Sequence, residues 1–234
     1  MIDIHSHILP GIDDGARTLS DSVDIVQELA SQGFTDIIAT PHYVTDTIYT
    51  SPRGDNIRLL MELRRALADT NINVNVYLGN EIFIDISIAE LLKRKVVSTM
   101  AESEYVLVEF SLNEEYPNYA DILGNLIEQG YKVILAHPER YLFFQRDYEI
   151  LESLCGMGVL MQCNLGSFVR QYGKTVEKLA IRLAKENKIF AFGSDIHHLR
   201  GDNSILKAQK RLRKYYSESE LERVLVKNPR LILG

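Results

Sequence analysis

Two histidines near the beginning of the chain have the spacing of metal ligands. His5 and His7 stand one residue apart at the end of a short apolar run, Met1–His5. Residues i and i+2 of a β-strand point to the same face, so both imidazoles are expected to aim at one point. Neutral imidazole is a common protein ligand for Zn²⁺, Mn²⁺ and iron. Taken alone, the pair also fits two unrelated surface histidines, and the rest of the chain decides between the two.

Further polar residues follow other apolar runs along the chain. Nine candidate metal ligands result, and five of the six histidines are among them: His5, His7, Asp14, His42, Glu81, Glu109, His137, Asp195 and His197. Mixed imidazole and carboxylate ligands suit Mn²⁺, Fe²⁺ or Zn²⁺ better than a metal selected by thiolates. Nine ligands are too many for one ion, so we expect two or three, with Glu81 or another carboxylate bridging them.

Short apolar segments that could position these residues alternate with amphipathic ones. The predicted strands are Met1–His5, Asp36–Thr40, Asn75–Gly79, Tyr105–Phe110, Lys132–Ala136, Val159–Cys163 and Ile189–Gly193. The first predicted helix opens at a capping box from Thr18 to Asp21 and ends at Gly33. Further helices are predicted over Ile57–Ala68, Ile88–Arg94, Ala120–Gln129, Asp147–Leu154 and Thr175–Glu186, and after the last strand.

Seven strand-then-helix units with no linker between them predict parallel strands joined by helical crossovers. A chain of 234 residues fits one α/β barrel. A closed or distorted (β/α) barrel is favoured over an open sheet because the candidate ligands follow nearly every strand. In barrels, such residues gather at the carboxyl ends of the strands. The expected architecture is therefore one domain over residues 1–234.

The charge of the predicted centre indicates an anionic substrate. The four candidate carboxylates carry −4 and three divalent ions would carry +6, inside a protein with a net charge of −6. Arg140, three residues after His137, would add another positive charge and can hold two phosphate oxygens. The alternative for Arg140 is a surface ion pair with Glu139. A phosphate ester is the expected substrate.

Composition and missing motifs exclude several other classes. The negative net charge disfavours nucleic acid as a partner. Neither Cys155 nor Cys163 is followed by the arginine of a C-x5-R phosphatase loop, and no P-loop is present. No apolar run is long enough to span a bilayer, and the ligands begin too early to leave room for a signal peptide. The expected location is the cytoplasm.

The chain resembles the polymerase and histidinol phosphatase (PHP) family. The matching motifs are HSHILPGIDDGA at the beginning, the histidine after ATP, the glutamate after the third strand, AHPER and GSDIHH. They follow the family's order along nearly the whole chain. The branch it is most similar to is that of the CpsB-type manganese-dependent protein-tyrosine phosphatases of Gram-positive bacteria. These enzymes counteract tyrosine kinases that control capsule and exopolysaccharide synthesis.

The resemblance implies a distorted seven-stranded barrel of the PHP type with three metal ions. The first ion would be held by His5, His7, Glu81 and Asp195, the second by Glu81, Glu109 and His137, and the third by Asp14, His42 and His197. Arg140 would bind phosphate. Arg200 is a second candidate for that role, at an offset that differs from the family's usual one. The implied partner is a phosphotyrosine protein, a bacterial tyrosine kinase.

The predicted reaction is direct hydrolysis by a hydroxide that bridges the metal ions. Asp14, His42 or His197 would assist proton transfer to the leaving phenolate. Three alternatives stay open: a histidinol-phosphate phosphatase or other PHP-family phosphoesterase, a metal-dependent amidohydrolase, and a non-catalytic docking protein stabilised by metal. The sequence makes no prediction of the oligomeric state.

Overall fold

The computed structural model describes residues 1–199 and 204–234. The strands are β1 (Ile2–Ser6), β2 (Asp36–Ala39), β3 (His42–Tyr43), β4 (Asn75–Leu78), β5 (Glu81–Phe83), β6 (Tyr105–Glu109), β7 (Lys132–Leu135), β8 (Leu160–Asn164) and β9 (Ile189–Gly193). They form two sheets, in the orders β1-β2-β4 and β3-β5-β6-β7-β8-β9. All pairs are parallel, as predicted.

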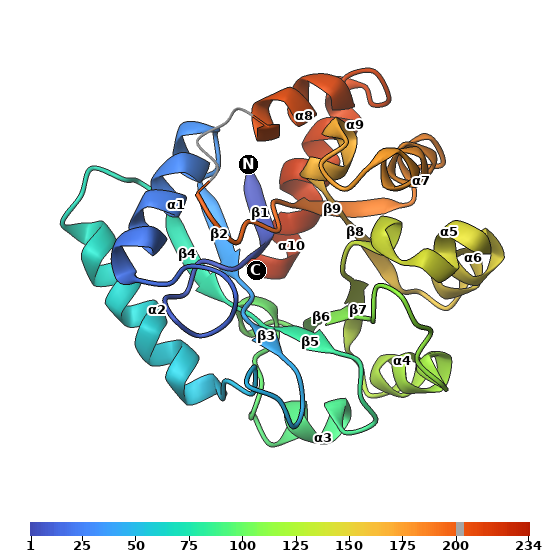
Figure 1. The fold of residues 1–234 in the computed structure, drawn as a ribbon, viewed down its shortest axis with the longest axis horizontal. Helices are drawn as coiled ribbons and strands as arrows, with labels where there is room; N and C mark the ends of the chain where they lie inside the picture. The colour runs from blue at the N-terminus through green and yellow to red at the C-terminus, as the bar shows by residue number, and fades with distance from the viewer. Residues whose placement is uncertain (200–203) are drawn as a thin grey trace.

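Helices surround the strands (Figure 1). The α-helices are α1 (Leu19–Ser31), α2 (Arg53–Ala68), α3 (Ile88–Lys93), α4 (Tyr119–Glu128), α5 (Leu142–Arg146), α6 (Tyr148–Gly156), α7 (Lys174–Lys185), α8 (Ser204–Leu212), α9 (Glu218–Glu222) and α10 (Asn228–Leu233). Short 3₁₀ turns cover Met100–Glu102, Pro138–Arg140 and Leu165–Val169, and a π-helical turn covers Arg223–Lys227. Within the described residues, we find no helix both long and apolar enough to cross a membrane.

Two of the seven predicted strands are interrupted and resume in the second sheet. β2 is followed by β3 after Pro41, which has no N–H to donate to a ladder. β4 is followed by β5 after Gly79 and Asn80. Backbone bonds still cross the interruption, because Gly79 N–H donates to Ala39 O at 2.8 Å and Glu81 N–H donates to Pro41 O at 3.1 Å. These backbone hydrogen bonds therefore connect the end of the first sheet to the beginning of the second.

The other junction lies between β1 and the segment after β9. Asp195 N–H donates to His5 O at 2.9 Å, and His7 N–H donates to Ile196 O at 3.0 Å. Ser6 and Ile196 form an isolated parallel bridge. The arrangement is the distorted barrel that the sequence predicts, with its strands divided between two hydrogen-bonded sheets.

A bulge in β1 helps to aim the first candidate ligands. Asp3 pairs with Ile37 and Ser6 pairs with Ala39, so β1 has one more residue than β2 over this stretch. Such a bulge bends a strand and redirects the side chains around it. His5 lies inside the bulge, at the point where β1 changes from apolar residues to candidate ligands.

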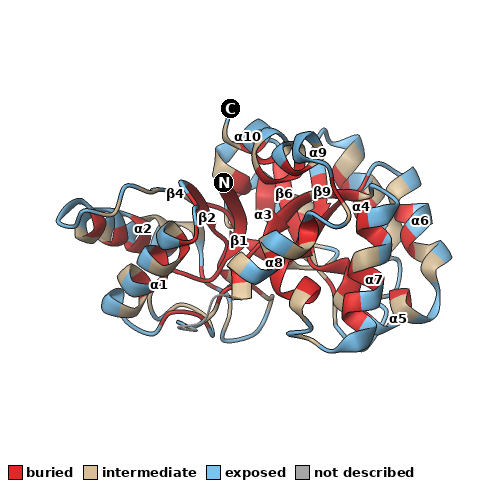
Figure 2. Cartoon of the chain, turned by 90° about the horizontal axis from the view of Figure 1, so that it is seen from above, coloured by how far each residue is buried: buried red, intermediate tan, exposed pale blue. Residues whose placement is uncertain are grey.

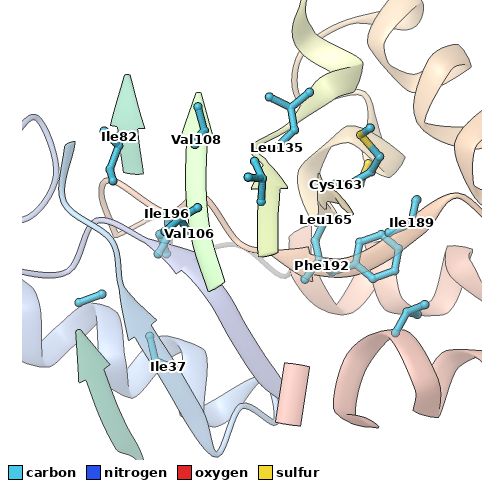
Figure 3. Packing of buried hydrophobic residues seen from close by; sticks show 14 of the residues in the cluster. Ile37, Ile82, Val106, Val108, Leu135, Cys163, Leu165, Ile189, Phe192 and Ile196 are labelled. Carbon is cyan, nitrogen blue, oxygen red and sulfur yellow. The ribbon is translucent and has the colours of Figure 1, made fainter. Parts of the chain in front are cut away.

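The core is divided by the alternation of side chains along each strand. In β6, Val106 and Val108 belong to a large cluster under the surrounding helices, whereas Tyr105 and Leu107 belong to a smaller one that includes Ile232 of α10. Figure 3 shows part of the large cluster, and Figure 2 shows that the strands are buried while the helices expose their outer faces. The apolar core thus holds the strand ends that carry the polar residues.

Candidate metal centre

Four predicted ligands converge in a buried group at the end of β1. His5 Nε2 lies 3.2 Å from His7 Nε2 and 3.1 Å from Glu81 Oε2. Asp195 Oδ1 lies 3.6 Å from His5 Nε2 and 3.5 Å from His7 Nε2. These are the residues that the resemblance assigns to one ion. Two imidazole nitrogens and two carboxylate oxygens facing one point form a donor set that suits a divalent cation.

A second group shares Glu81 with the first. His42 Nδ1 lies 2.9 Å from Glu109 Oε1 and 3.1 Å from Glu81 Oε2. His137 Nε2 contacts the other oxygen of Glu81, at 2.9 Å. Glu81 thus presents one oxygen to His5, His7 and His42 and the other to His137. This is the geometry expected of a bridging carboxylate.

The third group lies toward solvent. Asp14 Oδ1 is 3.5 Å from His42 Nε2 and 3.4 Å from His197 Nε2. The ring of His7 stacks on that of His197 with centroids 3.9 Å apart. The Asp14 side chain is 52% exposed, whereas those of His5, His7 and Glu81 are fully buried. The cluster is therefore open to solvent on the side of Asp14 and His197.

The electrostatics of the cluster fit bound cations. In the part of the chain that the structure describes, Glu81 Oε2 is buried beside three imidazole nitrogens, none of which is aligned to donate a hydrogen bond to it. Burial disfavours a charged imidazole, yet Glu81 and Glu109 raise the pKa of His42 to about 9. Burial would raise the pKa of Asp195, but the imidazoles of His5 and His137 hold that pKa well below its usual value. The carboxylates of Glu81 and Asp195 thus stay charged, and metal ions would replace the protons whose binding to His5, His7 and His42 the carboxylates favour.

Asp13, which the sequence analysis did not propose as a site residue, supports the cluster from behind. Its Oδ2 lies 2.9 Å from His7 Nδ1 and accepts the backbone N–H of His42 at 3.2 Å. A carboxylate on the far nitrogen of a ligating imidazole fixes the ring's orientation and tautomer. The side chain is also held by Gly15, whose N–H donates to Asp13 Oδ1 at 2.9 Å. The only sequence signal was its place beside Asp14.

Two of the predicted ligands have unusual backbone conformations. His137 has φ +32° and Asp195 has φ +49°, both in the left-handed region that non-glycine residues seldom occupy. Each residue follows the end of a strand, β7 and β9 respectively, where the chain turns away from the sheet. Strained backbone of this kind is retained where the surrounding structure fixes it, and it gathers at functional sites.

Arg140 lies beside the first group. Its Nη1 is 2.7 Å from Asp195 Oδ2, and its guanidinium carbon lies 4.5 Å from the centre of the Tyr172 ring. Its ion-pair partner is thus Asp195, whereas Glu139, the partner in the alternative that the sequence left open, is fully buried and accepts from Asn164 and Ser167. Arg200, the second predicted phosphate ligand, lies outside the described residues. The aromatic side chains after Arg140 pack in the core, where Tyr141 and Phe144 are buried.

Curated relatives match this chain over its whole length. Tyrosine-protein phosphatase YwqE of Bacillus subtilis (strain 168) is 30% identical over 234 residues, which cover 100% of this chain and 91% of that protein. Tyrosine-protein phosphatase CpsB of Streptococcus pneumoniae is 27% identical, with 100% and 98% covered.

A solved structure also matches the whole chain. It comes from work on YwqE and CpsB, described as unique metal-dependent tyrosine phosphatases. The match has a TM-score of 0.93 and 29% identity, and it covers 100% of this chain and 94% of that one. The family model for capsular polysaccharide synthesis, CpsB/CapC, matches residues 1–234. The chain therefore belongs to the CpsB/CapC family.

Proposed function

We propose that this protein is a metal-dependent protein-tyrosine phosphatase. The observation that carries the proposal is the convergence of nine imidazole and carboxylate side chains in three groups that share Glu81, His7 and His42. The relatives named above are tyrosine phosphatases, and the solved structures among them are called metal-dependent. We propose Mn²⁺ as the metal, in two or three ions, with iron or zinc as substitutes.

The proposed ligands are those that the resemblance assigns. His5, His7, Glu81 and Asp195 would hold one ion, Glu81, Glu109 and His137 another, and Asp14, His42 and His197 a third. The position of His42 between Glu81 and Asp14 lets it serve the second group as well as the third. When bound, such ions activate water and neutralise the negative charge of a phosphate ester.

The chain's own side chains would bind and orient the substrate. The Arg140 guanidinium can donate to two phosphate oxygens, while its contact with Asp195 keeps it directed at the cluster. Asp14, His42 and His197 lie on the solvent side, where the phenolic oxygen would leave, and can supply its proton there. Tyr172 beside Arg140 offers an aromatic face at the same edge.

The substrate we propose is phosphotyrosine in a protein, specifically a bacterial tyrosine kinase that controls capsule or exopolysaccharide synthesis. The family's description supports this choice, because it names capsular polysaccharide synthesis. The partial exposure of Asp14 and His197 is consistent with a residue presented by another protein.

Phosphate release tests the proposal. We would compare a phosphotyrosine peptide with histidinol phosphate, using metal-free protein, protein with Mn²⁺, and protein with a chelator. Manganese-dependent release from the peptide, abolished by chelation and by Glu81→Gln, is expected. Glu90→Gln, on the exposed face of α3, removes the same charge away from the site and should keep full activity.

Two other results would reject the proposal in different ways. Release from histidinol phosphate alone would keep the metal centre and assign a small-molecule substrate. Bound metal without release from either compound would favour a docking protein or another hydrolase.

A further inference from the structure

We propose that Gln162 and Asn164 of β8 are positioning residues that fix the orientation of two metal ligands, His5 and Asp195. The inference rests on the proposed metal centre, to which β8 contributes no predicted ligand. Both amide side chains are fully buried, and each contacts a predicted ligand of the cluster. Neutral amides at buried positions require hydrogen-bond partners, and here the partners are the ligands themselves.

A chain of three side-chain hydrogen bonds, which we call the amide relay, joins the two ligands. His5 Nδ1 lies 2.9 Å from Gln162 Oε1. Gln162 Nε2 donates to Asn164 Oδ1 at 2.8 Å, and Asn164 Nδ2 donates to Asp195 Oδ2 at 2.6 Å. The relay therefore runs from the first strand of the chain to the segment after the last one.

The direction of the relay is fixed at both ends. Gln162 Oε1 also faces the backbone nitrogen of His137, at 3.1 Å. A backbone N–H can only donate, so the atom that faces it must be the amide oxygen. At the other end, an ionised carboxylate can only accept, so Asn164 must turn its NH₂ group toward Asp195. Each end independently requires the same orientation of both amides.

This direction determines the tautomer of His5. Because Gln162 Oε1 is an acceptor, His5 Nδ1 must carry the proton. His5 Nε2, which faces His7, Glu81 and Asp195, is then free to bind a cation. On the Asp195 carboxylate, Asn164 and Arg140 both donate hydrogen bonds to Oδ2. The other oxygen, Oδ1, faces His5 and His7. The relay thus presents one atom of each ligand to the ion.

The surrounding structure leaves little room for the relay to shift. A Cβ atom at Gly193 would lie 2.6 Å from His5 Cβ and 2.8 Å from Gln162 Nε2, so only glycine fits behind them. Asn164 is also held through its backbone, since its N–H donates to the buried Glu139 Oε1 at 2.9 Å. The relay is thus held on several sides.

The test measures metal binding rather than turnover. Gln162→Leu keeps the volume but removes both the acceptor and the donor. We expect its Mn²⁺ affinity, measured by calorimetry, to fall by about 10–100-fold, the usual effect of losing a partner of a ligating histidine. In zinc-loaded protein with ¹⁵N-labelled histidine, the slowly exchanging Nδ1–H of His5 should disappear from the NMR spectrum.

Two further variants sharpen the result. Gln162→Glu still accepts from His5 and His137 but cannot donate to Asn164, so it should keep the Nδ1–H signal and lose less affinity than Gln162→Leu. Met161→Leu, the matched control, changes the adjacent buried residue of β8, which packs in the large apolar cluster. It should bind metal like the unmodified protein.

The outcomes separate this inference from the proposed function. Unchanged affinity and an unchanged His5 signal in Gln162→Leu would overturn the relay, whatever the activity. If Gln162→Leu fails to fold, loss of the signal in Gln162→Glu would overturn it. If Mn²⁺ binding depends on the relay but the protein releases no phosphate, only the phosphatase proposal is rejected.

Discussion

Arg140 makes two contacts that the residue types alone do not reveal. Its guanidinium lies 2.7 Å from the Asp195 carboxylate of the candidate metal centre, and 21% of its side chain is exposed. It also stacks against Tyr172. A planar guanidinium can satisfy both contacts and still offer donors to phosphate, which an ammonium group cannot do in the same geometry.

We therefore expect Arg140→Lys to retain bound metal but to lose activity. Removal of one preorganised donor usually lowers kcat by about 10²–10³-fold. A loss approaching that range is expected in kcat/KM for a phosphotyrosine peptide, because lysine keeps the charge but cannot form the bidentate hydrogen bonds of a guanidinium. The measurement is steady-state kinetics at a fixed Mn²⁺ concentration, together with metal content. Arg146→Lys, an exposed arginine in α5, is the control. Equal kcat/KM for both variants would argue against a phosphate-binding role.

Among individual residues, the sequence predicted the candidate metal ligands. It did not predict the residues that hold those ligands in place through hydrogen bonds. Imidazoles and carboxylates after strands stand out because metals prefer them. Gln162 and Asn164 carry no such signal, since buried amides serve many structural purposes. Asp13 was visible only as the neighbour of Asp14. Whether a side chain binds an ion or holds the residue that does so depends on the three-dimensional contacts.

Among the elements, α1 shows how local sequence sets a boundary. Thr18 accepts the backbone N–H of Asp21, and the Asp21 side chain accepts the N–H of Thr18, which is the capping box that the sequence predicts. The helix begins at Leu19 and brings Ile25, Val26 and Leu29 to the core. The chain between His7 and this helix carries Asp13 and Asp14.

Thr18→Ala should destabilise the fold by about 1 kcal/mol, because the backbone N–H of Asp21 loses its side-chain acceptor at the start of the helix. In a chain of this size, that loss lowers the Tm by roughly 2–4 °C in a thermal unfolding experiment. Ser20→Ala, on the exposed first turn of the same helix, is the control and should leave the Tm nearly unchanged. A Tm of Thr18→Ala equal to that of the control would mean that tertiary packing alone fixes this boundary.

Other boundaries depend on tertiary structure. β3 and β5 have two and three residues, too short for a periodic signal. They exist because β3 pairs with β5 and β5 pairs with β6. α2 begins at Arg53 rather than at the predicted Ile57, since its first turn buries the polar Asn56. α5 was not predicted, because its apolar residues Phe143 and Phe144 lie too close together to show a helical period. The seven predicted strands and the helices between them are confirmed.

For the whole molecule, the family and the architecture predicted from the opening motif, AHPER and GSDIHH are confirmed by the family model and by the solved structure of the relatives. The division of the strands between two sheets was not predicted. The division arises because Pro41 and Gly79 follow the ends of two neighbouring strands, β2 and β4, whose last residues, Ala39 and Leu78, are paired. A sequence-based prediction treats each strand separately and has no access to that alignment.

Metal binding should contribute to the stability of the entire fold. The proposed ligands come from β1, β3, β5, β6 and the segments after β1, β7 and β9, so an ion at the cluster ties distant parts of the chain together. At a free Mn²⁺ concentration 100 times the Kd, one site stabilises by about 2.7 kcal/mol. Chelation should lower the Tm by roughly 5–11 °C, at 2–4 °C per kcal/mol.

The measurement is differential scanning fluorimetry with and without chelator, followed by addition of Mn²⁺. The Tm should recover on addition of the metal, and Glu81→Gln should show a much smaller change. A Tm that does not respond to chelator or metal would contradict binding at this cluster.

The junction between β1 and the segment after β9 has a consequence for biosynthesis. His5 and Asp195 are separated by 190 positions, yet their backbones are hydrogen-bonded and their side chains face the same point. At about 5–20 residues per second, a ribosome adds Asp195 some 10–40 s after His5. Until then, the first histidines emerge without their partners. A nascent chain can therefore form helices and strands early, but it can assemble its complete ion-binding cluster only when translation has passed His197.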